Sequence, residues 1–278
     1  MGGQTILLSM DQTDWGDRFA VLMISVRCGD RSLPLGWRIE TGEANIGFAG
    51  QQVLLERVRA WLPEGAAVRL LADRFYPSAA LFDWLIAAGW QYWLRLKGNL
   101  LVDIGGAGIH TTGDLAAGMR ERYEAKAHLF DVSIPTAIGV LHESGHPEPW
   151  IIAMDCPPNR AAVLDYGARW AIEPMFSGFK SRGFRLEDTK IEAPKRLDGM
   201  ILIMAVAMYW CVQAGQDDAR CNPTATEKKA REQPDPNHWS VRKAYRSALS
   251  WFKRGLRLLL RRAASALPLP KFFLGMET

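Results

Sequence analysis

The sequence predicts an α/β protein built on a mixed sheet. Three strand-length runs of apolar, β-branched and aromatic residues open the 278-residue chain, at 5–10, 19–26 and 35–39. Segments with helical and strand spacing alternate after them. The composition, 48% hydrophobic and 23% charged, is typical of a globular chain and excludes a disordered one.

The first three runs form a meander, because a polar turn at 28–30 separates the second from the third. Apolar residues at helical spacing predict a helix over 53–62, which the Pro and Gly of 63–65 end. The short apolar run 68–72 predicts a buried strand that ends at Asp73.

A second helix is expected over 78–88. Ser78 is a suitable N-cap and Gly89 a suitable C-cap. Another strand follows at 92–96, so the order of the first elements is βββαβαβ.

The character of the chain changes after residue 100. A β-rich insertion is predicted over 100–156, with strand-like runs at 123–134, 137–141 and 150–154. Helical spacing returns at 160–179 and again at 197–213, before a polar linker or loop. The expected domain limits are 1–99 and 157–215 for the two parts of a core, 100–156 for the insertion, 216–240 for the linker and 241–278 for a carboxy-terminal region.

The charge of the chain is unevenly distributed. Residues 1–240 carry 25 basic and 29 acidic side chains, whereas 241–278 carry nine basic side chains and one acidic. Arg254 and Arg257 belong to a basic amphipathic helix predicted there, whose polar face suits a phosphate backbone. A solvated helix face and a membrane-surface helix are the alternatives.

The cysteine spacing and the apolar runs indicate the cellular compartment. The four cysteines form no CxxC pair and no apolar leader opens the chain, so we expect neither a disulfide framework nor secretion, but a reducing cytoplasm. The longest apolar run, 200–212, is shorter than the roughly 20 residues that span a bilayer, so we expect a buried helix and no membrane.

Two aspartates follow predicted strands, Asp11 after the first and Asp73 after the strand at 68–72. If these strands are neighbours in one sheet, both carboxylates project from the same edge. Hard oxygen ligands of this kind suit Mg²⁺ or Mn²⁺, and a third carboxylate would complete a phosphoryl-transfer site. The alternative is that both aspartates form turns or cap helices.

The third carboxylate lies in the pattern Y-x2-R-x3-E-x6-K, formed by Tyr166, Arg169, Glu173 and Lys180. At about 100° per residue these side chains share one face of a helix, while apolar residues occupy the other. A carboxylate flanked by two cations and a phenol can hold metal and bind phosphates. The alternative is an amphipathic helix with an ordinary Glu–Arg pair.

This pattern resembles the signature of bacterial insertion-sequence transposases with a DDE triad. The segments Met10-Asp11-Gln12-Thr13, Leu71-Ala72-Asp73-Arg74 and Lys180-Ser181-Arg182-Gly183 also resemble blocks of that family. The similarity runs from Asp11 to about Gly215. It implies an RNase H-like core with a β-rich insertion between the second Asp and the Glu.

The resemblance also implies roles. Asp11, Asp73 and Glu173 would be the catalytic metal ligands for two Mg²⁺ or Mn²⁺ ions, and Tyr166, Arg169 and Lys180 would contact DNA phosphates. The implied reaction is hydrolysis at transposon ends, after which a free 3′-OH attacks target DNA, within a synaptic homodimer in the nucleoid-associated cytoplasm. Separately, Arg95 and Lys97 alternate onto one strand face and are further candidates for phosphate contact, unless they are solvated edge charges.

Two features depart from the family pattern. Pro174 follows Glu173 directly, so the helix should kink or restart there. Asp11 lies only ten residues from the start, whereas relatives carry an amino-terminal recognition domain, so we expect a truncated core. A remnant that binds DNA without cutting it, and a host RNase H-like nuclease or resolvase, are the rival hypotheses.

One further motif is discounted. The segment 142–146 reads H-E-x-x-H, which binds zinc when it is helical. Gly145 lies inside it and prolines follow, so we expect a polar hairpin loop instead.

Two other features also receive a structural interpretation. The glycines of 105–108 are interpreted as a turn, since no helix or lysine of a phosphate loop follows. Trp150 and Trp170 are expected to be buried, although either could stack on an unpaired base.

Overall fold

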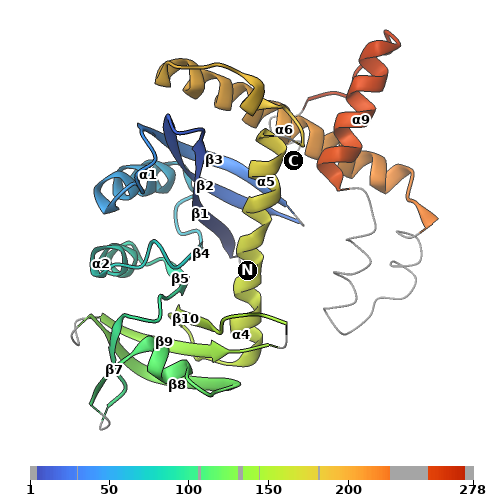
Figure 1. Ribbon diagram of the computed structural model, residues 1–278. Coiled ribbons are helices and arrows are strands. Elements are labelled where there is room, and N and C mark those ends of the chain that lie inside the picture. The colour runs from blue at the N-terminus through green and yellow to red at the C-terminus, as the bar shows by residue number, and fades with distance from the viewer. Residues whose placement is uncertain are drawn as a thin grey trace. The chain divides into compact units, whose positions relative to one another are not determined.

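The computed structural model describes residues 5–29, 31–105, 108–130, 134–143, 145–180, 182–225 and 250–272. The chain forms two compact units, Met1–Gly178 and Phe179–Thr278. The first contains the sheet and the second contains long helices (Figure 1). Each unit is described by itself.

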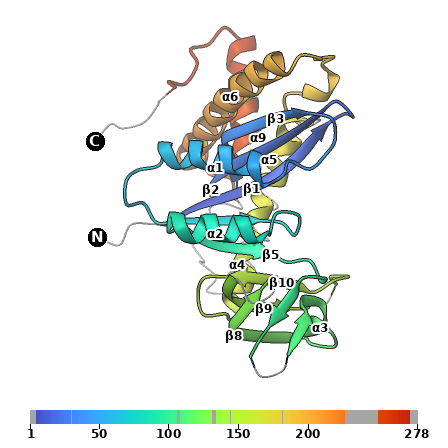
Figure 2. The same ribbon diagram turned by 90° about the vertical axis from the view of Figure 1, so that its left-hand side faces the viewer.

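The described strands of the first unit form one ten-stranded sheet in the order β3-β2-β1-β4-β5-β10-β9-β8-β6-β7 (Figures 1 and 2). The strands are β1 (Ile6–Trp15), β2 (Phe19–Cys28), β3 (Arg31–Thr41), β4 (Val68–Ala72), β5 (Gln91–Arg95), β6 (Leu101–Asp103), β7 (Ile109–Thr111), β8 (Glu121–Leu129), β9 (Ile134–Leu141) and β10 (Trp150–Met154). β1, β4 and β5 run parallel, and the remaining pairings are antiparallel. The predicted α/β class with a mixed sheet and an RNase H-like core is confirmed.

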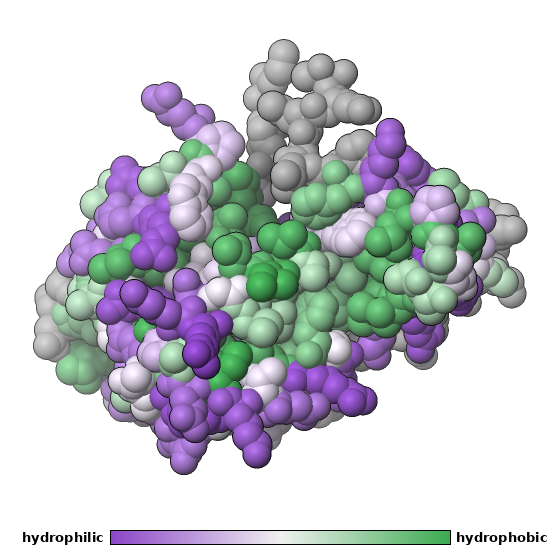
Figure 3. Space-filling model, turned by 90° about the horizontal axis from the view of Figure 1, so that it is seen from above, coloured by the Kyte–Doolittle hydropathy of each residue, from purple (hydrophilic) through white to green (hydrophobic). Residues whose placement is uncertain are grey.

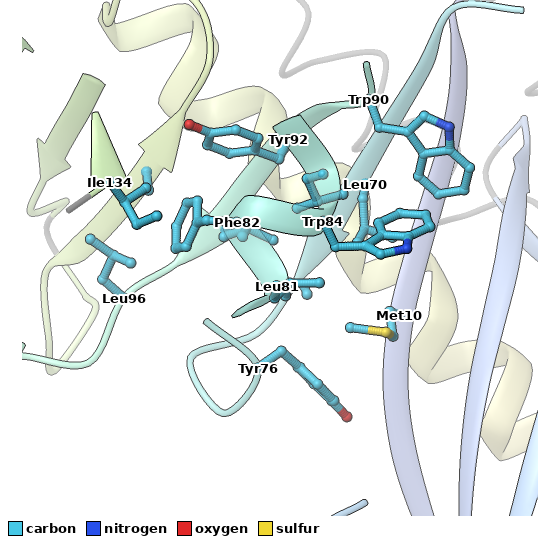
Figure 4. Close-up of a cluster of buried hydrophobic side chains, with 14 of the residues drawn as sticks. Met10, Leu70, Tyr76, Leu81, Phe82, Trp84, Trp90, Tyr92, Leu96 and Ile134 are labelled. Carbon is cyan, nitrogen blue, oxygen red and sulfur yellow. The ribbon is translucent and has the colours of Figure 1, made fainter. Parts of the chain in front are cut away.

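Two crossover helices cover one face of the core strands. α1 (Phe48–Trp61) connects β3 to β4, and α2 (Ala79–Ala88) connects β4 to β5 (Figures 1 and 2). Figure 4 shows their shared core, in which Phe82 meets Tyr92 edge to face with ring centroids 5.1 Å apart. The indole of Trp84 also donates a 2.6 Å hydrogen bond to Glu56, which joins α2 to α1.

The opposite face of the sheet carries a second core. Because side chains alternate along a strand, Leu70 points into the α1–α2 core while Leu71 points away from it. Leu71 packs with Trp93, Val163 and Tyr166. This second face, covered by the segment after β10, is the one on which the functional side chains lie.

The local predictions for the second crossover are confirmed. Ser78 caps α2 by accepting a hydrogen bond from the Leu81 amide, and Gly89 ends it in the left-handed conformation at φ 67°. β4 has the predicted limits. α1 begins at Phe48, earlier than the predicted residue 53.

Asp11 does not close the first strand, contrary to the prediction. β1 continues to Trp15 because β2 pairs with it from Leu8 to Trp15. On the other side of β1, the ladder to β4 stops at the Met10–Ala72 pair. Asp11 is therefore the first residue beyond the parallel ladder, although it lies inside a strand.

The β-rich character of the region after residue 100 is confirmed, but its strands differ in detail. The predicted run 123–134 is divided between β8 and β9, and a short helix, α3 (Thr112–Ala116), was not predicted. β10 pairs with β5, so the sheet continues from the core into this region. The predicted domain limits stay a prediction.

The helical segment predicted over 160–179 is present, but it is not one α-helix. It consists of α4 (Arg160–Asp165), a 3-10 segment η1 (Tyr166–Ala171) and α5 (Ile172–Phe179). The even angular spacing assumed for an α-helix therefore does not apply across 166–171. Pro174 lies in the first turn of α5, where its missing amide costs no helical hydrogen bond, so the expected restart of the helix is confirmed.

The second unit contains a short 3-10 turn, η2 (Leu186–Asp188), and two long helices, α6 (Pro194–Cys221) and α9 (Trp251–Ala264). Residues 216–221, predicted as linker, belong to α6 because this end of the helix packs against α9. The parts of the predicted linker and basic helix at 226–249 lie outside the described residues. Within the described ranges, α9 supports the predicted amphipathic helix, with Phe252 and Leu259 buried and Arg257 exposed.

By length and composition, α6 could cross a membrane. The core helix of a soluble protein can have the same length and composition, and this helix buries Met204, Met208 and Val212. Hydrophobic residues reach the surface on the face drawn in Figure 3. Among the described residues of α6, Leu202 and Ile203 are exposed.

The backbones of α6 and α9 come into direct contact at two glycines. A Cβ atom on Gly215 would collide with the carbonyl oxygen of Trp251, and one on Gly255 would collide with that of Cys211. Arg254 pairs with Asp218 beside this contact and also donates to the Asn222 carbonyl. The crossing thus requires two residues without side chains.

We expect Gly255→Ala to lower the free energy of unfolding by about 1–3 kcal/mol, because α9 must move away from α6 to admit a methyl group. Gly199→Ala in α6 is the control, since nothing lies within 4 Å of its added Cβ and alanine should stabilise the helix by roughly 0.5–1 kcal/mol. Urea unfolding followed by circular dichroism measures both. Equal effects of the two substitutions would contradict the close contact.

Candidate active site

The register of two parallel strands brings the two aspartates together. Met10 of β1 pairs with Ala72 of β4, so Asp11 and Asp73 are the next residues of each chain segment. By alternation both side chains point to the sheet face opposite α1 and α2. Adjacent strands lie about 4.8 Å apart, which accounts for the electrostatic repulsion between the two carboxylates. The predicted convergence of the two aspartates is thereby present.

Asp11 is the more enclosed of the two carboxylates. Its Oδ1 accepts hydrogen bonds from the Gln12 amide at 3.0 Å and the Tyr76 hydroxyl at 3.3 Å. Its Oδ2 accepts a hydrogen bond from Arg169 at 3.0 Å. Burial raises the pKa of Asp11 above its ordinary value, and neighbouring Asp73 adds to this, although Arg169 and the Gln12 amide act in the opposite direction.

Asp73 begins the turn that follows β4. Its Oδ1 accepts a 2.7 Å hydrogen bond from the amide of Arg74, and its carbonyl accepts one from the amide of Tyr76 at 3.1 Å. Tyr76 is buried, and burial raises the pKa of its hydroxyl, so the hydroxyl stays protonated and donates to Asp11. The turn after Asp73 therefore also fixes Asp11.

Glu173 reaches the aspartates through Arg169. Arg169 donates to Asp11 through Nη1 and to Glu173 through Nη2, at 3.0 and 2.9 Å. The side chain of Arg169 is 6% exposed and that of Glu173 is 56% exposed. One buried guanidinium thus bridges a carboxylate of the sheet and a carboxylate of α5.

Acidic neighbours keep the Arg169 guanidinium positively charged. Burial alone lowers the pKa of Arg169, but its acidic neighbours outweigh burial and raise the pKa above its ordinary value. These neighbours are Tyr166, Asp11, Asp73 and Glu173. Removing the guanidinium would leave adjacent carboxylates without their buried counter-ion.

Segment η1 is fixed to the sheet at two points. The Tyr166 hydroxyl donates to the carbonyl of Ala72 at 3.4 Å, and Arg27 of β2 donates to the carbonyl of Ala168 at 2.8 Å. Tyr166 is buried and its ring contacts Trp150 with centroids 6.0 Å apart. It therefore supports the position of Arg169, and its predicted contact to phosphate stays a prediction.

Arg95 extends the line of functional side chains to a third strand. Ala72 pairs with Leu94, so Arg95 of β5 lies in register beside Asp73 on the same sheet face. Its guanidinium lies 3.6 Å from Glu148. Lys97, two residues on, is exposed. Arg95 is the last residue of β5 and Lys97 lies beyond the strand, and the roles of both in phosphate contact stay predictions.

The remaining predicted DNA contacts lie in the second unit. Lys180 lies 3.8 Å from Glu187. Arg254 is 9% exposed and joins α9 to α6 through Asp218, whereas Arg257 is exposed on α9. The roles of all three in DNA binding stay predictions.

Sequence reasoning missed Tyr76 and Glu148. The aromatic residue three positions after Asp73, within the turn that follows the strand, is a local signal that could have identified Tyr76. Glu148 lies 74 residues from Arg74, with which it pairs at 2.7 Å. No local pattern links such distant residues.

The H-E-x-x-H segment is not helical where it is described, as predicted. Nε2 of His142 lies 3.0 Å from the carbonyl oxygen of His146, and Glu143 pairs with Arg160 of α4. His146 stacks near Trp170, with ring centroids 6.5 Å apart. Trp150 is 8% exposed and Trp170 is 37% exposed, so the expected burial is confirmed for Trp150 only.

The donor chemistry of two of the three carboxylates fits a divalent cation. The carboxylates of Asp11 and Asp73 are hard oxygen ligands placed in register, and the buried Arg169 shows that this cluster requires a positive charge. Among the residues that the structure describes, no three His, Cys, Asp or Glu side chains are grouped closely enough to hold a metal. Arg169 lies between Asp11 and Glu173 instead.

Comparison with known proteins gives one extensive match. The model of the family described as "Transposase DDE domain" matches residues 10–210. A comparison with curated proteins gave no match.

Two solved structures show weaker likeness. Endonuclease V of Ciona intestinalis, in complex with a 24mer DNA containing an inosine followed by a ribo-adenosine, is 11% identical with a TM-score of 0.35, over 62% of this chain and 86% of that chain. Argonaute of Marinitoga piezophila, in complex with 5′ OH guide RNA and target DNA, is 10% identical with a TM-score of 0.27, over 59% of this chain and 24% of that chain.

We expect Asp11→Asn to raise the free energy of unfolding at pH 7, measured by urea unfolding with a chelator present. The folded-state pKa of Asp11 is raised above its ordinary value of 3.8, so the stability due to its proton is present below that value and is lost as the pH rises through the folded pKa. The neutral amide avoids this loss. The difference from wild type should vanish near pH 3.8 and below.

Asp83→Asn on α2 is the control, because Asp83 is exposed and its substitution makes the same change in charge. If Asp11→Asn were no more stabilising at pH 7 than Asp83→Asn, the burial of the Asp11 charge would be wrong.

Proposed function

The chain belongs to the transposase DDE domain family, and from that premise we propose that it is a metal-dependent DNA transposase with Asp11, Asp73 and Glu173 as its triad. The proposed reaction cleaves DNA strands at transposon ends and transfers the freed 3′-OH into target DNA. The proposed partners are these two DNAs and a second copy of the chain in a synaptic complex, in a nucleoid-associated cytoplasmic location.

One observation carries the proposal. Asp11 and Asp73 lie in register on neighbouring parallel strands, and Arg169 links Asp11 to Glu173. The three carboxylates come from positions far apart in the chain, at residues 11, 73 and 173. Two of them lie side by side and the third is linked to Asp11 by Arg169, and this arrangement, within the region that matches the family, supports a catalytic centre.

The family generally uses divalent metal ions, and we propose Mg²⁺ or Mn²⁺, two ions per site, held by the triad. Bound there, such ions supply the Lewis acidity that activates a water molecule or a 3′-OH and stabilises the leaving oxygen.

The chain's own side chains would prepare this site. The Tyr76 hydroxyl fixes Oδ1 of Asp11, and Arg169 orients Glu173 toward the sheet. Arg169 and Arg95 would also bring positive charge to the phosphates on either side of the scissile bond, with Lys180 and Tyr166 as further proposed contacts. No covalent intermediate with the protein is required.

A second candidate is a chain that binds DNA without cutting it. One observation favours this candidate: among the described residues no third carboxylate is grouped with Asp11 and Asp73, and Glu173 is paired with Arg169 instead. The two candidates differ in whether cleavage depends on the carboxylates.

We expect the full chain to nick supercoiled plasmid in Mg²⁺ or Mn²⁺, and Glu173→Gln to slow nicking by about 100-fold or more, because loss of a metal ligand should exceed the effect of losing a supporting contact. The measurement is the rate of relaxed-circle formation at equal folded concentration.

Glu64→Gln is the matched control, since Glu64 is exposed in the turn after α1 and the change in charge is the same. Nicking that persists in a chelator, or that is equal in wild type and Glu173→Gln, would contradict the proposal. Plasmid binding without nicking in the wild type would favour the second candidate.

A further inference from the structure

An exposed aromatic side chain stands beside the carboxylates. Phe75 lies two residues after Asp73, in the turn closed by the hydrogen bond from Tyr76 to Asp73. Tyr76 points into the core and is 7% exposed, whereas Phe75 is 57% exposed. The buried neighbour fixes the turn, so the Phe75 ring is held outward next to the site.

Two cations lie near the Phe75 ring. Nζ of Lys97 lies 5.0 Å from the ring centroid, and the guanidinium carbon of Arg74 lies 5.9 Å from it. Both distances are within the range of cation–π interactions. Lys97 comes from the segment after β5, so the group combines two separate parts of the chain.

Glu148 arranges the cations of this group. Its Oε2 accepts a 2.7 Å hydrogen bond from Arg74 and lies 3.6 Å from Arg95. A single carboxylate therefore orients two guanidinium groups and leaves the surface with net positive charge. Arg74, Phe75, Arg95, Lys97 and Glu148 are together called the Phe75 surface.

We propose that the Phe75 surface binds an unpaired DNA base next to the scissile phosphate, with the base stacked on Phe75 and the cations on the adjacent phosphates. The inference rests on the proposed function, because it places single-stranded DNA at the triad. A rigid aromatic ring beside several cations is the combination with which proteins bind single strands. An isolated exposed phenylalanine needs no explanation, but one that has two cations within about 6 Å of its ring centroid and lies two residues after Asp73 has this use.

Binding of a fluorescent single-stranded oligonucleotide, measured by anisotropy with the full chain in a chelator, tests the proposal. Phe75→Ala should weaken binding about fivefold or more, as expected for loss of one stacked base. Trp61→Ala is the matched control, because Trp61 of α1 is 55% exposed and belongs to a helix on the other face of the sheet. Its affinity should stay that of the wild type.

Two further variants separate stacking from general hydrophobic contact. Phe75→Trp should keep the affinity, whereas Phe75→Leu should lose most of it, because leucine is apolar but has no aromatic face. An unpaired base analogue such as 2-aminopurine in the oligonucleotide should change its fluorescence with Phe75→Trp and wild type, but not with Phe75→Ala.

Several results would overturn the proposal. These are no binding by the wild type, equal binding by wild type and Phe75→Ala, an equal loss with Trp61→Ala, or full affinity with Phe75→Leu, which would indicate a protein partner. Because the chelator removes cleavage, the outcome is separate from the nicking assay. Nicking that depends on Glu173 with unaltered binding by Phe75→Ala would reject the stacking site alone.

Discussion

The parallel register between β1 and β4 is the constraint on which the site depends. Because Met10 pairs with Ala72, the next residues of the two strands are Asp11 and Asp73, and the same register extended to β5 adds Arg95. A shift of either strand by one residue would turn its carboxylate into the α1–α2 core. The apolar alternation of β4, with Leu70 on one face and Leu71 on the other, opposes such a shift. The core thus determines the position of the charges.

Like charges placed this closely require compensation, and Arg169 provides it. The guanidinium is buried, so its position must be fixed by the backbone around it rather than by solvent. Two hydrogen bonds achieve this, from Tyr166 to the Ala72 carbonyl and from Arg27 to the Ala168 carbonyl. The 3-10 segment η1 therefore fixes the position of the positive charge in the site, because these two hydrogen bonds hold the segment that contains Arg169.

The features that could be predicted from the sequence are those that neighbouring residues determine, such as helix caps and strand limits. The caps Ser78 and Gly89 and the limits of β4 follow from nearby residues, and the triad followed from a resemblance together with strand positions. The extension of β1 past Asp11 depends on pairing with β2, which periodicity does not reveal. A 3-10 segment and an α-helix have similar apolar spacing, so η1 was missed. The pair between Arg74 and Glu148 requires the fold itself.

The antiparallel pairing of β10 with β5 has a consequence for how this architecture can vary. Residues 100–149 depart from the core and β10 returns to complete its edge, so the sheet continues through Leu94–Ala153. Loss of the excursion together with β10 would leave β5 with a bare row of amides and carbonyls, an edge prone to join other chains. Farther out, β6 and β7 lie at the end of the sheet, where a change in length would leave the pairing of β10 with β5 intact. The pairing of β10 with β5 thus fixes the part of this region next to the core, whereas the part around β6 and β7 is free to vary in length.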